Sequence, residues 1–439
     1  MEEQQRITRF AVTDYRDIRK LFGIKERNRR HHIYVIGKTG TGKSTLIHNM
    51  AVSDIYAGCG MAVIDPHGDL AEGIMNCIPE SRIADVIYFN PADSEYPVAF
   101  NPLENVPADQ RHLVASKLIS VFKKIWHEFW GPRLEHILRH AVLTLMEYPD
   151  GTLLDIPRLL TDKDFRQAIL PYIKHQQVRE FWFTEFEKYS TWFRSEAVSP
   201  ILNKVGLFLT SDLLRNIVGQ KKNAFNLRQA MDEGKILVVN LAKGKIGEDN
   251  ASLLGSLLVA EIYLSALSRA DMPEKGRQSF YLYVDEFHNF MTLSFADILS
   301  EARKYGLSLV LAHQYLEQLD EKIRAAVFGN VGTIITFRVG NEDAKYLVGE
   351  FGPVFDEHDL SNLENHHIYL KLMIDGVTSK PFSAVTLPSP DVDVSHREKI
   401  VESSRARFAK KREDIEKAIM TARFRPPAEP EKPRQSRLL

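Results

Sequence analysis

The 439-residue sequence predicts an α/β protein whose mostly parallel sheet is interrupted by a long all-helical segment. Two observations support this fold class. Short apolar runs with the length of buried parallel strands alternate with helical stretches in the first hundred residues, and such runs return after about residue 230. Between residues 107 and 229 the runs disappear and helical periodicity dominates. Strands that alternate with helices are typical of a layered α/β fold.

The composition is that of a globular protein, with 44% hydrophobic and 26% charged residues, which excludes bulk disorder, collagen and coiled coil. The formal net charge of -1 does not by itself indicate a nucleic-acid partner. Two cysteines cannot form a disulfide framework, so we expect a reducing, cytoplasmic compartment. No apolar run approaches the length of a membrane span. We therefore expect no intrinsic span, and recruitment by a partner if the protein works at the inner face of the cell membrane.

The first 30 residues are polar and rich in Lys and Arg, and we expect a basic N-terminal segment there. Residues 31–106 are expected to begin the α/β domain. The strands expected in this part are Ile33–Gly37, Met61–Asp65 and Asp85–Phe89.

Residues 107–229 are expected to form an all-helical insertion domain. Helical periodicity is clear in Arg133–Glu147 and Glu196–Phe208. Aromatic residues are dense, and the run Phe181–Phe193 at helical spacing indicates the core of this domain. His136 and His140 could face each other on one helix turn, but the zinc-protease pattern has Glu after the first His, so we expect structural histidines.

The strand rhythm resumes in residues 230–390, which complete the α/β domain. The expected strands are Lys235–Ala242, Ser279–Glu286, Leu307–His313, Gly332–Val339 and His367–Leu372. Residues 391–423 are predicted to contain one long charged helix, about Ser395–Ala422, whose mixed charge is typical of a solvated face. The Pro-rich residues 424–439 are predicted to be a disordered tail.

The strongest motif is Gly37-Lys-Thr-Gly-Thr-Gly-Lys-Ser44, a complete G-x-x-x-x-G-K-[ST] between an expected strand and an amphipathic helix. Its glycines let backbone N–H groups surround phosphate oxygens at a helix N-terminus. Lys43 would neutralise the β- and γ-phosphates, and the Ser44 hydroxyl would ligate Mg²⁺. The motif predicts ATP and Mg²⁺ as cofactors, bound through Gly37, Lys38, Thr39, Gly40, Thr41, Gly42, Lys43, Ser44 and Thr45.

A second group of polar residues follows two later strands. Asp285 ends one strand and would hold Mg²⁺, and Glu286 would act as the general base for the attacking water. Gln314 ends the next strand, where a polar side chain can sense the γ-phosphate. Arg303 lies between these strands, and in ring ATPases such an arginine reaches the γ-phosphate of the neighbouring subunit. The predicted catalytic residues are Lys43, Glu286, Arg303 and Gln314, and the predicted metal ligands are Ser44 and Asp285.

With these motifs the chain resembles the HerA/FtsK group of ring-shaped DNA motors, and within it the coupling-protein ATPases of conjugation and type IV secretion. The resemblance covers about Ile33–Leu387. Besides the phosphate loop, it rests on an ordered series of segments: DPHGDL at Asp65–Leu70, NLAKGKIGEDNASLLGSLL at Asn240–Leu258, YVDEFHNF at Tyr283–Phe290, EARKYGLSLVLAHQY at Glu301–Tyr315 and GNVGTIITFRVGNEDA at Gly329–Ala344. The DPHGDL segment has no role assigned from its residues.

The resemblance implies a RecA-like motor domain with an inserted all-α domain. It also implies a homohexamer that moves single- or double-stranded DNA through its centre, with ATP hydrolysed between subunits. Arg303 aligns with the trans-acting arginine of the group and Gln314 with the sensor. Secretion-channel or relaxosome proteins would dock on the helical insertion. Only 36 residues precede Gly37, and none of them forms the membrane span usual in coupling proteins. They are also too few for the β-barrel of HerA proteins. The sequence leaves open whether the chain is a soluble relative or a truncated one.

The loop after the strand near residue 240 offers Lys243 and Lys245 among glycines as candidate DNA contacts, although a flexible solvated turn has the same pattern. The sequence is compatible with two other functions. One is a HerA-like helicase or translocase in DNA processing. The other is a nucleotide-gated docking platform with little turnover, against which the Asp285-Glu286 pair counts, because a scaffold does not need a general base.

Overall fold

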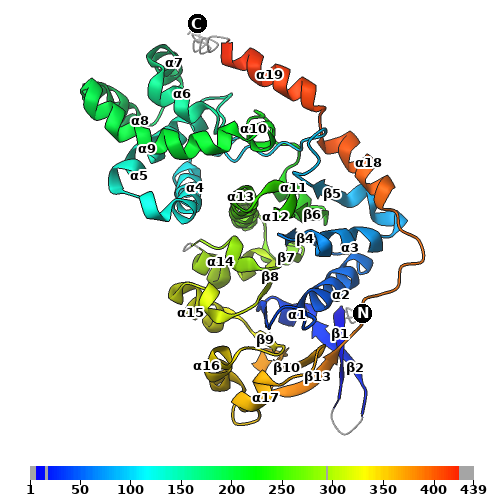
Figure 1. Ribbon diagram of the computed structural model, residues 1–439. Helices are drawn as coiled ribbons and strands as arrows, with labels where there is room; N and C mark the ends of the chain where they lie inside the picture. Colours follow the sequence, from blue (N-terminus) through cyan, green and yellow to red (C-terminus); the bar gives the residue numbers. More distant parts are fainter. Residues whose placement is uncertain (1–5, 15–17, 293–294, 425–439) are drawn as a thin grey trace, which may run out of the picture. The chain divides into compact units, whose positions relative to one another are not determined.

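The computed structural model describes residues 6–14, 18–292 and 295–424. The chain divides into two compact units. The first comprises the residues up to Ala92 and Phe225–Phe408, and the second comprises Asp93–Ala224 and the residues from Ala409 onward. The predicted α/β fold with an all-helical insertion is confirmed (Figure 1). The unit boundaries fall near residues 92 and 224, where the sequence placed them near 106 and 229.

An eleven-stranded sheet organises the first unit, in the order β2-β1-β13-β10-β9-β3-β8-β7-β4-β6-β5. The strands from β9 to β5 pair in parallel, and the others are antiparallel. The strands are β1 Ile7–Thr13, β2 Leu21–Lys25, β3 Ile33–Ile36, β4 Gly60–Asp65, β5 Val86–Phe89, β6 Ile236–Asn240, β7 Phe280–Val284, β8 Leu307–His313, β9 Thr333–Thr336, β10 His367–Lys371 and β13 Phe382–Thr386. A small separate ribbon pairs β11 Met373–Ile374 with β12 Val377–Thr378.

The parallel strands are mostly apolar, as expected for strands with both faces covered. Every residue of β3, β4, β6, β7 and β8 is buried. The helices of this unit are α1 Glu26–Arg29, α2 Lys43–Tyr56, α3 Asp69–Cys77, α11 Leu227–Asp232, α12 Lys243–Ile246, α13 Glu248–Leu267, α14 Phe295–Glu301, α15 Glu321–Asn330, α16 Asn341–Phe351, α17 Glu357–Ser361 and α18 Arg397–Phe408.

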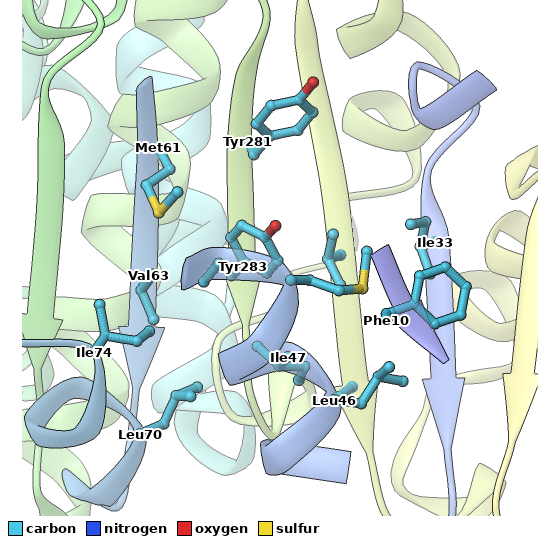
Figure 2. Close-up of a cluster of buried hydrophobic side chains, with 14 of the residues drawn as sticks. Phe10, Ile33, Leu46, Ile47, Met61, Val63, Leu70, Ile74, Tyr281 and Tyr283 are labelled. Carbon is cyan, nitrogen blue, oxygen red and sulfur yellow. The ribbon is translucent and has the colours of Figure 1, made fainter. Parts of the chain in front are cut away.

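Helices α2 and α3 contribute to the core on one face of the sheet. Figure 2 shows Leu46 and Ile47 of α2 near Tyr283 of β7, and Ile74 of α3 near Val63 of β4. All five side chains are at most 2% exposed. Each such aliphatic side chain contributes about 1.5–3 kcal/mol when it is fully buried. This packing holds the start of α2 over the centre of the sheet.

The basic N-terminal segment contains two strands that sequence analysis did not predict. Strands β1 and β2 extend the sheet, since β1 pairs antiparallel with β13 at Ala11↔Thr386. Phe10 and Ile24 point into the core, and Arg29 is buried rather than solvated. The short alternation of apolar side chains in β1 was hidden by the charged residues around it. The pairing of β1 with β13 joins residues far apart in the sequence, so no local pattern predicts it.

The second unit is built from helices: α4 Arg111–Ile125, α5 Pro132–Glu147, α6 Asp155–Thr161, α7 Lys163–Ile169, α8 Gln176–Glu180, α9 Thr191–Thr210, α10 Asp212–Val218 and α19 Arg412–Phe424. Trp182 is fully buried and donates a 2.8 Å hydrogen bond to Thr144 Oγ1. Trp192, in the same aromatic run, is 74% exposed. The run therefore supplies core residues and surface residues alike.

The two histidines of α5 have structural contacts. The ring of His140 stacks on Phe181 at 4.1 Å between centroids, and His136 Nε2 lies 3.2 Å from Glu185 Oε2. Within residues 6–14, 18–292 and 295–424, no three His, Cys, Asp or Glu side chains gather as a metal site would require.

The prediction of one long charged helix near the C-terminus is wrong, because this segment forms two helices, α18 and α19. Ala409 forms a β-bridge with Val98, and this bridge interrupts the chain between α18 and α19. Helix α18 covers the edge strand β5. Ser404 Oγ accepts a 2.9 Å bond from Tyr88 N, and Arg407 donates to Val86 O at 2.9 Å. The predicted disordered tail lies outside the described residues, apart from Phe424 at the end of α19.

One helical stretch of the described residues, Glu248–Asp271, is long and apolar enough to cross a membrane by length and composition. Isolated polar residues divide this stretch into short apolar runs, so no uninterrupted apolar run in it reaches that length. Inside the protein 72% of its most apolar window is buried. This burial is typical of a core helix.

Candidate active site

Three neighbouring strands bring the predicted motifs to one edge of the sheet. Strand β8 lies between β3 and β7, and all three run parallel. The phosphate loop follows β3, Asp285-Glu286 follows β7, and Gln314 follows β8. Because carboxyl ends of parallel strands share an edge, residues far apart in the sequence meet there.

The phosphate loop depends on backbone conformations that favour glycine. Gly40 has φ 77° and Gly42 has φ 118°. A Cβ on Gly42 would lie 2.8 Å from His366 Nδ1, so space and conformation both require glycine. Lys43 begins α2, and its Nζ donates to Gly37 O at 2.7 Å and to Lys38 O at 3.2 Å. The loop therefore holds its lysine in a ready, pre-formed position.

The predicted metal ligands are in contact. Ser44 Oγ donates a 3.0 Å hydrogen bond to Asp285 Oδ2. Burial and the charges of Glu286 and Asp65 raise the pKa of Asp285 to about 6, against the effects of Ser44 and Lys43. A hydroxyl and a crowded, buried carboxylate are the hard oxygen donors that Mg²⁺ prefers. A divalent cation here would relieve the repulsion between the acids, so these residues fit the metal.

The predicted base has one occupied and one unsatisfied oxygen. Gln314 Nε2 donates a 2.8 Å hydrogen bond to Glu286 Oε1. Glu286 Oε2 is buried without a hydrogen-bond partner, 3.5 Å from His288 Nδ1. Glu286 also has φ 45°, a left-handed conformation that is costly for a residue with a Cβ. The unsatisfied carboxylate oxygen of this strained residue can accept a hydrogen bond from a substrate water.

The DPHGDL segment has a structural role that sequence reasoning did not assign. Asp65 Oδ1 accepts from His67 N at 2.8 Å, and its Oδ2 accepts from Ala71 N at 2.9 Å. The fully buried carboxylate thus organises the turn between β4 and α3. Its negative charge also lies close enough to raise the pKa of Asp285, so a bound cation would stabilise both carboxylates.

A cavity of about 380 Å³ adjoins the phosphate loop. Its lining residues are Lys38, Thr39, Gln314, Tyr315, Gly340 and Asp343. Sequence reasoning missed Tyr315 and Asp343. Asp343 Oδ1 accepts from Leu316 N at 2.9 Å, which ties the segments after β9 and β8 together. These residues closely follow the two strands beside β3, and that position was the available signal.

Arg303 does not join the other predicted catalytic residues. It precedes β8, so it lies at the amino edge of the sheet, opposite the phosphate loop. The side chain is exposed, and Nη1 lies 3.0 Å from His31 Nδ1. Arg303 is therefore placed away from the site formed by its own chain.

The expected flexible loop at Lys243 and Lys245 is instead a short helix, α12. The backbone N of Lys243 donates to Pro66 O at 2.9 Å, which fixes the start of this helix. Lys245 is exposed, and its Nζ lies 3.8 Å from Glu72 Oε1. The two glycines around these lysines concealed the helix from sequence reasoning.

The sequence matches the family model of the type IV secretion-system coupling protein DNA-binding domain over residues 18–354. The chain belongs to this family. No curated protein sequence matches the chain. It is a P-loop ATPase of the HerA/FtsK type, and the RecA-like motor domain with an inserted all-α domain is confirmed.

Solved structures share the fold. The unbound bacterial conjugative coupling protein TrwBdeltaN70 aligns with a TM-score of 0.61 and 18% identity, over 90% of this chain and 91% of that chain. TrwB in complex with the GTP analogue GDPNP aligns with a TM-score of 0.59 and 18% identity, over 85% of this chain and 89% of that chain. VirB4 of Thermoanaerobacter pseudethanolicus aligns with a TM-score of 0.55 and 13% identity, over 90% of this chain and 98% of that chain. These likenesses show the fold, and the membership in the type IV secretion-system coupling proteins rests on the family model.

Proposed function

We propose that the protein hydrolyses ATP with Mg²⁺ at the subunit interfaces of a homohexameric ring and uses the energy to move DNA. The observation that carries the proposal is the contact network of Ser44, Asp285, Glu286 and Gln314 at the edge that also holds the phosphate loop. TrwB, which shares the fold, has been solved with ADP and Mg²⁺ and with the ATP analogue ADPNP. These complexes support the same ligands here.

The residues of the site divide the reaction between them. Loop N–H groups and Lys43 bind the phosphates, and Lys43 exchanges its bonds to loop carbonyls for phosphate oxygens. Ser44 and Asp285 would hold Mg²⁺, which neutralises charge on the phosphates. Glu286 Oε2 orients the attacking water and accepts its proton. Gln314 fixes the other carboxylate oxygen and can respond when the γ-phosphate leaves.

The position of Arg303 supports the proposed ring. Transition-state charge on the transferred phosphoryl group is commonly stabilised by an arginine. Arg303 is at the opposite edge of its own sheet, so its part in the reaction would be at the site of a neighbouring subunit. A closed ring of identical subunits supplies one such arginine to every site.

For DNA contact we propose Lys243 and Lys245 of α12, which follow β6 at the same edge as the phosphate loop. The double Lys243→Ala/Lys245→Ala variant should lose DNA stimulation of the ATPase and keep the basal rate. Unchanged stimulation would contradict this assignment. We also propose that the helical unit docks secretion-channel or relaxosome proteins and that such a partner recruits the protein from the cytoplasm to the inner face of the membrane.

The deciding experiment is steady-state ATPase activity with and without single- or double-stranded DNA. Lys43→Ala and Glu286→Gln should both abolish turnover, and Glu286→Gln should still bind and retain ATP. Lys345→Ala, which removes an exposed cation of α16, is the matched control and should behave as the wild type. Lys43-dependent turnover that ignores DNA would refute DNA translocation. Wild-type function in Glu286→Gln would instead indicate a nucleotide-gated docking platform.

A further inference from the structure

The backbone that carries Arg303 is rigidly supported. Arg303 belongs to the 3₁₀ turn Ala302–Tyr305. The buried Arg269 donates to Tyr305 O at 3.0 Å and to Gln278 O at 2.8 Å. The turn ends at Gly306, whose φ of 74° suits glycine. The base of the Arg303 side chain is thus fixed while its guanidinium is exposed.

One side chain contacts the exposed guanidinium. Arg303 Nη1 lies 3.0 Å from His31 Nδ1 and 3.3 Å from His31 Nε2. Burial and the charge of Arg303 lower the pKa of His31, so its ring is neutral near pH 7 and can hold the guanidinium without like-charge repulsion. The position of His31 is itself restricted. Gly332 N donates to His31 O, and a Cβ on Gly332 would lie 2.6 Å from His31 Cβ.

The next residue anchors this turn to the segment before Arg303. His32 is buried with φ 61°, a strained conformation for a side chain with a Cβ. Its Nδ1 accepts from Leu309 N at 3.1 Å, so Nε2 carries the proton that is donated to Leu299 O at 3.1 Å. Burial lowers the pKa of His32 to about 4, which keeps this tautomer neutral. His32 thus fixes the start of β3 against the end of α14, four residues before Arg303.

We propose that His31 is a positioning residue that holds the Arg303 guanidinium in the orientation needed at the active site of the neighbouring subunit, with His32 as its anchor. The inference rests on the proposed trans role of Arg303. An exposed arginine samples many rotamers, and ordering it at the moment of reaction costs free energy. A neutral ring that holds it in advance removes part of that cost from the barrier.

The experiment compares ATPase kinetics of His31→Ala, His31→Gln, Arg303→Ala and the double variant His31→Ala/Arg303→Ala. His31→Ala should lower kcat about 10- to 100-fold with KM unchanged, because transition-state stabilisation is lost and ATP binding is not. His31→Gln keeps a neutral acceptor and should restore most of kcat. In the Arg303→Ala background, His31→Ala should cause no further loss. Lys304→Ala, an exposed cation on the same turn, is the matched control and should not change kcat.

The outcomes separate this inference from the proposed function. Arg303→Ala with wild-type kcat would refute the trans arginine itself. Loss of activity in Arg303→Ala together with normal kcat in His31→Ala would overturn the positioning role alone. A loss in His31→Ala that persists at full size in the Arg303→Ala background, or that Gln fails to rescue, would also overturn it. Thermal unfolding of each variant shows whether a loss reflects misfolding, and rescue by Gln decides the question where stability falls.

Discussion

A buried ion pair offers the sharpest test of how the N-terminal residues hold the motor domain together. Arg29 Nη1 donates to Asp54 Oδ1 at 2.6 Å, and the two side chains are 0% and 2% exposed. Arg29 also donates to Thr8 Oγ1 at 2.7 Å and lies 3.6 Å above the ring of Tyr281. Tyr283 OH donates to Asp54 Oδ2 at 2.5 Å. The cluster joins β1, α1, α2 and β7.

Replacing Arg29 with Met should cost about 3–5 kcal/mol of unfolding free energy. The variant leaves the Asp54 carboxylate buried with only the hydroxyls of Thr8 and Tyr283 as partners, and those hydrogen bonds cannot replace a full charge. Replacing both members, Arg29→Met with Asp54→Leu, should recover most of the loss, because no uncompensated charge remains. The double variant thus separates the cost of burying a lone charge from the loss of packing.

The measurement is equilibrium unfolding in urea followed by far-ultraviolet circular dichroism. All four tryptophans belong to the helical unit, so tryptophan fluorescence does not report on this cluster. Lys399→Ala is the control variant, since its partner Glu80 and Lys399 itself are both exposed, and it should leave the midpoint unchanged. A loss below about 1 kcal/mol in Arg29→Met would refute the reasoning. A double variant less stable than Arg29→Met would also refute it.

Three further predictions concern other parts of the molecule. Without nucleotide or metal, Asp285→Asn should raise the free energy of unfolding by about 2–3 kcal/mol above pH 6, and this gain should fade toward pH 4. The reason is that folding raises the pKa of Asp285 to about 6, so the carboxyl group destabilises the native state only when it is ionised. Equilibrium unfolding at several pH values tests this. Gly42→Ala should abolish nucleotide binding, measured with a fluorescent analogue, because its Cβ meets His366 and its φ is positive; normal affinity would contradict the described loop. Trp182→Phe should cost about 1–3 kcal/mol in the helical unit, measured by calorimetry, because Thr144 Oγ1 loses its indole partner, and an unchanged midpoint would contradict the bond.

Sequence reasoning found the strands and site residues whose signals are local. The phosphate loop and Asp285-Glu286 are contiguous motifs that follow apolar strands, so their chemistry and their place on the sheet could both be predicted. Strands buried on both faces were also readable as short apolar runs. Sequence reasoning failed at β1 and β2, where the apolar alternation is brief and β1 links β2 to the distant strand β13.

The sequence by itself determined the chemistry of this protein: a phosphate loop, a carboxylate pair and the strands that end in them, because each is specified by residues adjacent in the chain. The tertiary structure alone decided which side chains meet. It buries Arg29 against Asp54. It lets Asp65 accept hydrogen bonds from the turn before α3, and it places His31 against Arg303. The last contact joins residues 272 positions apart. Such contacts depend on the order of strands in the sheet, and no local pattern of residues encodes that order.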